Sequence, residues 1–414
     1  MLLSYNFPPT LNPLTYLIIC YAPLFAFISL SLKPVTGKFH ACILCIIILF
    51  QVLIPFIYHG KYDSSIQFQT SAFAALISFK MIIWMKKNYQ FSIDSKTKIP
   101  SFIGSLFNWR PNAITISEDS NYQKYIDSIT VKDLNLEMIN HIIKIIIKSV
   151  ILGFLVKFLR NNVPEIPERS YALRVLDYLW AGRPFIDLYT YFYCYLWISY
   201  AIINFSVIWN FNCIIYGLIL RPLLSNCVKG DKKPQEQKSL KINAKEWLIL
   251  TIFYTQPLMS NPYFSISPRD FWSNQWHQMF YLAFQELGYL PVRKYFSHNR
   301  TLGNMLGICA VFLISGLVHD YIAIVVFNHF SIDFIVFFLF HALFLILWEV
   351  VEGKILGRRK NINDGFIIRI IKFSIFLPIA VFSLPQFAEP YIRGEYFYSY
   401  LDIRKNLEKW GVSN

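Results

Sequence analysis

Charged residues are scarce in this sequence, at 15% of its 414 positions, whereas an ordinary soluble domain carries about 25%. Hydrophobic residues reach 55% and aromatic residues 18%. A soluble core of this length cannot bury so much apolar surface. The shortage of charge therefore argues against an ordinary soluble protein and predicts a polytopic membrane protein.

The sequence also lacks the signatures of several enzyme classes. It has no Gly-rich phosphate loop, and the absence of a Gly-x-Ser-x-Gly element argues against a serine hydrolase. Its eight histidines are scattered, with no pair spaced by three or four positions, which argues against a metal centre. Its seven cysteines are dispersed, mostly within apolar runs, so we expect no disulfide framework.

Long apolar runs recur along the whole chain, and a helix needs about 20 such residues to cross a bilayer. The runs lie at 13–32, 39–58, 67–85, 186–220, 303–327, 331–351 and 366–386. The fourth run fits either one long tilted helix or two shorter pieces. With shorter apolar stretches added, the sequence predicts an all-α bundle of about eight or nine membrane helices, some short or re-entrant, in a single domain over residues 1–414.

The net charge of +14 comes from basic loops between these runs. Such loops favour the cytoplasm and lie well beside anionic membrane lipid, so we expect no nucleic-acid partner. Basic residues follow the first and third runs: Lys33, Lys38, Lys86, Lys87, Lys96 and Lys98. They predict an integral membrane protein, of the endoplasmic reticulum, with a lumenal N-terminus. We expect the first run to be retained as an anchor.

One helix between these runs carries a polar stripe on an otherwise apolar surface. Within residues 137–160, Glu137, His141, Lys144 and Lys148 recur three or four positions apart. The stripe fits either a helix that lines a substrate path or an interfacial helix whose lysines reach the membrane surface.

A cluster of polar and aromatic residues interrupts the apolar pattern at 267–278, "SPRDFWSNQWHQ". Ser267, Pro268 and Asp270 have the spacing of a helix start with a capping box. If the helix continues, Trp272 and Trp276 share one face.

The opposite face of that helix would carry Asp270, Asn274 and His277. A helix that faces lipid would not carry such a polar side, whereas one lining a wet or reactive cavity would. The cluster is therefore a candidate site.

A second candidate is the sequence "SGLVHDY" at 315–321, inside an apolar run. Burying a histidine such as His319 in the middle of a membrane helix costs free energy unless the side chain has a hydrogen-bond partner, so its presence there suggests a function. Ser315 and Gly316 remove bulk one turn earlier, which leaves room for a helix or a ligand. Asp320 points elsewhere on a helix, so we do not expect it to orient His319. Histidine suits general-base activation of a hydroxyl buried in lipid.

The pair of motifs, "DFWSNQWHQ" (270–278) followed by "SGLVHDY" (315–321), resembles the membrane-bound O-acyltransferase superfamily, and within it the wax-synthase-type branch of plants and fungi. The resemblance covers about residues 260–321. It implies a multi-helix membrane fold around a central reaction chamber. Acyl-CoA would enter from the cytosolic side and a lipophilic alcohol from the bilayer, with CoA as a product and no bound cofactor or metal.

The resemblance also assigns roles to residues. It implies that His319 is the catalytic base and His277 the second catalytic residue, with Asp270 either a third catalytic residue or a helix cap. The candidates for substrate binding are Trp272, Trp276, Asn274 and Arg269, although the two tryptophans also suit packing or interfacial anchoring. Where related sequences carry Gly and basic residues around the Trp-His pair, this chain has Ser273, Asn274, Gln275, Phe280 and Tyr281. Substitutes for contacts with the CoA phosphates are Arg269, Arg293, Lys294 and Arg300.

Several alternatives remain open at this stage. The acceptor can be a long-chain alcohol, which would give a wax ester, or a sterol, diacylglycerol, terpenoid or polyketide hydroxyl. A membrane transporter with a buried His and Asp pathway is a rival of another class, and a non-catalytic scaffold is a third. Acyl length and oligomeric state are not predicted.

Overall fold

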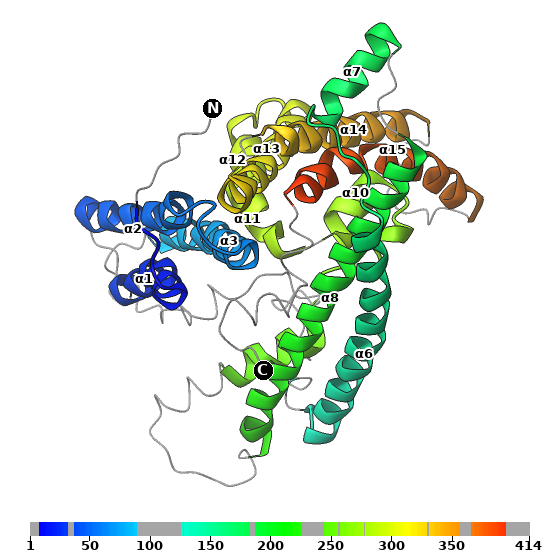
Figure 1. Ribbon diagram of the computed structural model, residues 1–414. Helices are drawn as coiled ribbons and strands as arrows, with labels where there is room; N and C mark the ends of the chain where they lie inside the picture. Colours follow the sequence, from blue (N-terminus) through cyan, green and yellow to red (C-terminus); the bar gives the residue numbers. More distant parts are fainter. Residues whose placement is uncertain are drawn as a thin grey trace.

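A computed structural model describes most of the chain as helices packed on one another (Figure 1). The described residues are 8–31, 37–88, 126, 128–182, 187–225, 244–255, 257–276, 278–328, 331–355 and 366–394. Within these ranges the elements are helices and no strand is formed. The expected all-α fold class is therefore confirmed.

Seven helices of the described residues are long and apolar enough to cross a membrane. They are α1 (Pro13–Ser31), α2 (Lys38–Ile57), α3 (Ser64–Asn88), α8 (Leu188–Ser225), α13 (Arg300–Phe327), α14 (Asp333–Ile355) and α15 (Phe366–Arg393). Each overlaps one of the predicted runs, and the run at 186–220 forms one unbroken helix. The chain is thus a polytopic membrane bundle.

The three N-terminal helices pack together to one side of the molecule, coloured blue in Figure 1. Their shared core contains Phe27, Leu44 and Ile77, all fully buried. Two hydrogen bonds to backbone carbonyls connect this group to α13. The Gly60 amide donates to the Val325 carbonyl at 3.0 Å. The Tyr321 hydroxyl donates to the Val52 carbonyl at 2.9 Å. These contacts hold the helix that carries His319.

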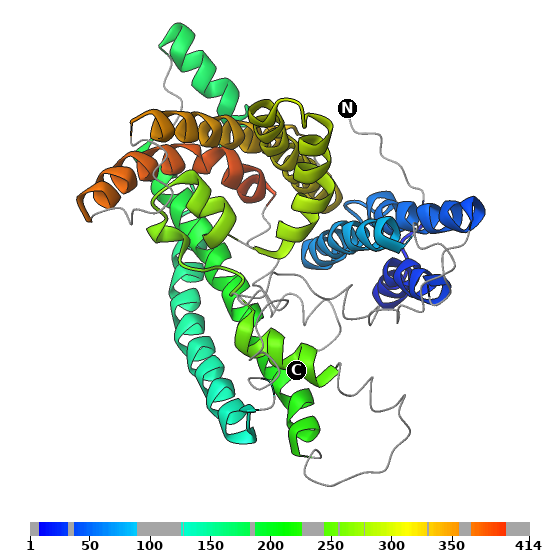
Figure 2. The same ribbon diagram turned by 180° about the vertical axis from the view of Figure 1, so that it is seen from behind.

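Helices α6 (Val131–Asn161) and α8 run side by side as a long pair (Figures 1 and 2). Two residues of the predicted polar stripe of α6 face this partner, and the first is His141, whose Nδ1 lies 2.9 Å from Asn210 Oδ1. Lys148 donates to the Ser206 hydroxyl in the same interface. These two stripe residues therefore join two helices, which is a different role from the two expected ones.

The segment between α8 and α13 is built of short helical turns. They are η2 (Leu250–Tyr254), η3 (Pro262–Phe264), α10 (Pro268–Asp270), η4 (Phe271–Gln275), η5 (Gln278–Phe280), α11 (Tyr281–Phe284), η6 (Gln285–Tyr289) and α12 (Leu290–Tyr295). Three of these, η2, η4 and η6, are π-helical, a form found as single turns that often mark functional sites.

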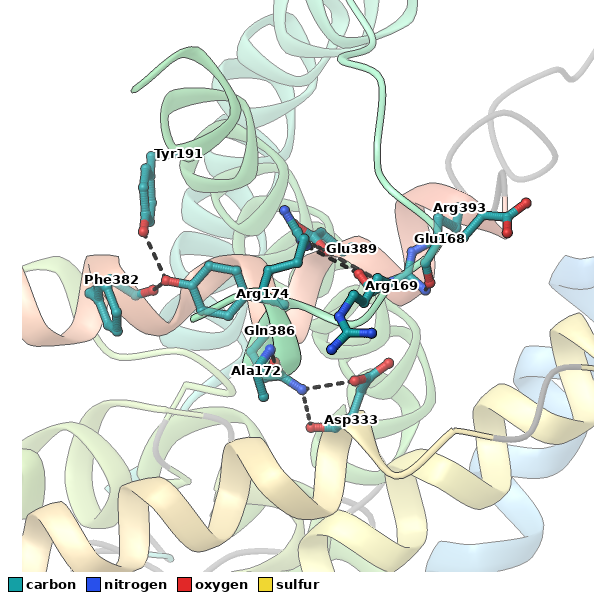
Figure 3. Close-up of polar contacts among 11 residues, drawn as sticks. Glu168, Arg169, Ala172, Arg174, Tyr191, Asp333, Phe382, Gln386, Glu389 and Arg393 are labelled. Atoms are coloured by element: carbon teal, nitrogen blue, oxygen red, sulfur yellow. Dashed lines mark hydrogen bonds and ion pairs between the residues drawn. The ribbon is translucent and has the colours of Figure 1, made fainter. Parts of the chain in front are cut away.

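A buried polar network docks α7 (Tyr171–Ala181) onto α15 and α14 (Figure 3). Arg174 donates both to Glu389, whose side chain is fully buried, and to the backbone carbonyl of Arg169. The Gln386 amide donates to Asp333 at 3.0 Å, and its oxygen accepts from the Ala172 N–H at 2.7 Å. The network therefore fixes α15 against two neighbouring elements.

Close packing of α13 on α14 depends on Gly316. A Cβ atom at this position would lie 2.7 Å from the Ile335 Cα and 3.1 Å from the Ile335 backbone nitrogen. Asp320, one turn further along α13, faces the backbone of Phe334 and Ile335 in the first turn of α14, where the helix dipole favours negative charge. The space that the sequence placed beside His319 is thus filled by a helix.

We expect Gly316→Ala to destabilise the protein, because the added methyl group must push backbone atoms of α14 away. Overpacking of this kind costs about 1–3 kcal/mol. Gly353→Ala is the matched control, since Gly353 is a helical glycine of α14 with no atom within 4 Å of the position that a Cβ would take. The midpoint of thermal unfolding in detergent should fall for the first variant and not for the second. Equal midpoints for the two variants would contradict the close approach.

Candidate functional site

The motif segment begins as predicted, with a capped helix start. The Ser267 hydroxyl accepts a hydrogen bond from the Asp270 backbone N–H at 3.1 Å, and Pro268 occupies the first turn. The Asp270 carboxylate in turn accepts from the Ile266 N–H at 3.3 Å and from the Asn274 amide at 3.1 Å. Asp270 therefore organises its own segment, as a cap does.

The helix does not continue through the motif, so the predicted single helix with two faces is wrong. After α10 the chain makes the π-helical turn η4, and Trp276 is extended with φ −80° and ψ 152°. The cause is tertiary, because the Gln275 carbonyl accepts from the Ser260 N–H at 3.0 Å. This hydrogen bond holds the end of η4 against the loop that contains Ser260, and the helix ends there.

Both tryptophans of the motif line an apolar cavity of about 90 Å³, smaller than the roughly 300–1,000 Å³ of pockets that enclose a whole drug-sized ligand. Five parts of the chain form its walls: α8, the loop 262–265, the turn 271–276, α14 and α15. Aromatic and aliphatic side chains dominate the lining, including Phe337, Phe376 and Phe387. Burial raises the pKa of Tyr263 in the loop, so its hydroxyl remains a hydrogen-bond donor at neutral pH.

His341 of α14 also lines this cavity, and its side chain is buried, with the residue 3% exposed. Its Nε2 lies 2.9 Å from the Ser383 hydroxyl of α15. Its Nδ1 accepts from the Trp272 indole N–H at 3.4 Å, a long contact. The motif segment, α14 and α15 thus meet at one histidine.

His319 lies behind an aromatic layer, outside the lining of this cavity. Its ring centroid is 4.8 Å from that of Phe338 and 5.5 Å from that of Phe387, which lines the cavity. Its Nδ1 lies 2.8 Å from the Ser315 carbonyl. A carbonyl can only accept, so Nδ1 carries the hydrogen and Nε2 is the basic nitrogen of the neutral ring.

The remaining predicted site residues have separate positions. Arg269 forms an ion pair with Glu349 of α14 at 2.7 Å, and its side chain is 61% exposed. Asn274 is exposed and bonded to Asp270. Neither of them lines the cavity. His277 lies outside the described residues. The structure therefore brings Trp272 and Trp276 together, while Arg269, Asn274 and His319 stand apart from them.

His341 is a cavity residue that lies outside both sequence motifs. Its signal was in the sequence, because it is a lone histidine within the apolar run "FIVFFLFHALFLIL" of 334–347. An ionisable residue inside a membrane segment is a functional candidate by default. No group of three or more His, Cys, Asp or Glu that could hold a metal occurs in the described part of the chain.

Part of the sequence that forms this site is similar to a known protein family. Residues 255–340 match the membrane bound O-acyl transferase family. A stretch of 67 residues, 16% of this chain, is 30% identical to the "Probable long-chain-alcohol O-fatty-acyltransferase 1" of Arabidopsis thaliana. The match spans about a fifth of the length of that curated relative (20%). Together the two matches confirm the resemblance to the wax-synthase type of membrane-bound O-acyltransferases.

Proposed function

We propose that this chain, which carries the membrane bound O-acyl transferase match over residues 255–340, transfers an acyl group from acyl-CoA to the hydroxyl of a lipophilic alcohol. The observation that carries the proposal is that the matched segment contains both motifs, and that it contributes to an apolar cavity between membrane helices. The similarity to a long-chain-alcohol acyltransferase favours a long-chain alcohol as acceptor.

In the proposed mechanism, His319 acts as the general base. Its Nε2 takes the proton of the alcohol as the oxygen attacks the thioester carbonyl carbon. The carbon–sulfur bond then breaks, and CoA leaves as a thiol by taking back the proton that His319 Nε2 removed from the alcohol. His277 would stabilise the negative oxygen of the intermediate by donating a hydrogen bond. The products are an ester and free CoA.

The other motif residues have supporting roles in this proposal. Trp272 and Trp276 contact the lipophilic substrate from the cavity wall. Asp270, together with Asn274, is a positioning residue, because its carboxylate holds the turn that carries both tryptophans. Arg269 remains a candidate contact for CoA through its exposed guanidinium.

The proposed location is the endoplasmic reticulum membrane, with a lumenal N-terminus and acyl-CoA on the cytosolic side. Lys86, at the C-terminal end of α3, donates to the Glu286 carbonyl at 3.2 Å. The C-terminal end of α3 therefore lies beside η6, and α12, which follows η6, carries Arg293 and Lys294. These basic side chains suit the CoA phosphates.

The test uses vesicles that contain the purified full chain, a labelled long-chain acyl-CoA and a panel of alcohols. We expect ester formation with a long-chain primary alcohol, and slower or no formation with a sterol or a terpenoid alcohol. Empty vesicles and vesicles with an unrelated membrane protein are the controls. Failure to form an ester from every alcohol of the panel would contradict the proposal.

A further inference from the structure

The hydrogen-bond roles at His341 follow from its neighbours. The Ser383 hydroxyl donates to the Ala380 carbonyl at 2.8 Å, so its oxygen must accept from His341 Nε2 at 2.9 Å. Nε2 therefore carries the hydrogen, and Nδ1 is the nitrogen with the lone pair. The Trp272 N–H is directed at this lone pair. The wall of an apolar cavity thus presents one acceptor and one donor side by side.

This pair suits a particular chemical group. Trp272 Nε1 and His341 Nδ1 lie 3.4 Å apart. If the two atoms moved apart by about 1 Å, an oxygen could lie between them at normal hydrogen-bond distance from both. A hydroxyl oxygen would accept from the indole N–H while its hydrogen is donated to Nδ1. An ester, a thioester, an ether or an ionised carboxylate has no hydrogen to donate, so it would leave the nitrogen lone pair unpaired in an apolar site.

We propose that the cavity is a binding site for a lipid with an apolar body and a terminal hydroxyl, which inserts between Trp272 and His341. Leu377, which lines the cavity from α15, is 37% exposed, so the cavity borders a surface that membrane lipid covers. A lipid can therefore reach the site from the bilayer, with its hydroxyl end inside the cavity and most of its chain in the surrounding membrane.

The site is distinct from the proposed base. Phe387 lies between the two, because it lines the cavity and its ring is in contact with the His319 ring. The bound lipid would be the acceptor alcohol in a position that precedes reaction, and this identification rests on the proposed acyl transfer. The binding itself does not depend on that activity.

The experiment compares two photoreactive probes on the full chain in vesicles. One is a long-chain primary alcohol with a diazirine in its chain, and the other is its methyl ether. We expect both probes to label cavity residues of α15, within 373–387, but the alcohol to do so at a concentration about tenfold lower than the ether. The ether cannot donate a hydrogen bond to His341 Nδ1, and leaving this buried acceptor without a donor weakens binding by about that factor.

Two matched variants separate the two ring nitrogens of His341. His341→Asn places an amide group where Nδ1 lies and loses the contact with Ser383, whereas His341→Gln reaches Ser383 and loses the group at the Nδ1 position. The asparagine variant should keep the preference for the alcohol and the glutamine variant should lose it. The thermal unfolding midpoint of each variant shows whether the protein is folded.

Four results would overturn the inference: equal labelling by alcohol and ether, labelling outside the cavity, no labelling, or an unchanged preference in folded His341→Gln. Ester formation is measured on the same vesicles. The expected labelling pattern without any ester would contradict the proposed function and leave the binding site standing. Ester formation without the labelling pattern would contradict the binding site and leave the proposed function standing.

Discussion

Replacing His319 by alanine is expected to lower the rate of ester formation by a factor of about 10² to 10⁴, the usual contribution of a general base. The variant removes the basic Nε2 that the Ser315 carbonyl orients through Nδ1. The rate is measured with saturating acyl-CoA and alcohol in vesicles, so that the loss is one of turnover. The amount of folded protein is measured in parallel.

His59→Ala is the control for this prediction. His59 makes the same type of contact, with its Nδ1 2.8 Å from the Phe56 carbonyl, but it follows α2 and lies outside the matched segment 255–340. Its loss should change the rate less than twofold. If His319→Ala retained more than half of the activity, another residue would be the base, and His277 or His341 would be tested next.

Glu389→Ala is expected to lower the free energy of unfolding by about 3–5 kcal/mol, because it leaves the buried guanidinium of Arg174 without its carboxylate. The Glu389 side chain is fully buried and that of Arg174 is 9% exposed. The loss of α15 docking would also disturb Ser383 and Phe387, which lie on the same helix. Unfolding is followed by heat in detergent and by protease resistance.

A double variant provides the control, since replacing both charges with apolar side chains is often neutral or stabilising. Arg174→Met with Glu389→Met should unfold at a higher temperature than Glu389→Ala alone. Arg393, which also reaches Glu389 at 3.4 Å, is 20% exposed and can turn to solvent. Equal losses in the single and double variants would mean that packing, rather than an unpaired charge, dominates.

The helices could be predicted from the sequence because the requirement to span a bilayer is local. Lengths of about 20 apolar residues were enough to locate α1, α2, α13 and α14 to within three or four residues of their observed ends. The helix start at Ser267 was also predictable, since a cap depends on neighbours three positions apart. That residues 1–414 form a single domain stays a prediction.

The site needed tertiary information that periodicity does not contain. The break at Trp276 depends on the contact between Ser260 and Gln275, and Arg174 meets Glu389 across 215 positions. Trp272 and Trp276 line the cavity, whereas the continuous helix expected from the sequence would have turned its opposite, polar face toward a cavity. The role of His341 could not be predicted from neighbouring residues, because its partner Ser383 lies 42 positions away on another helix.

The most direct test of the proposed acyl transfer follows the oxygen of the alcohol. Vesicles with the full chain receive acyl-CoA and a long-chain primary alcohol whose hydroxyl carries a heavy isotope of oxygen. The proposed mechanism predicts that the ester retains the heavy oxygen and that one CoA thiol appears for each ester formed. An ester without the isotope, or CoA release with no ester, would contradict attack by the alcohol on the thioester.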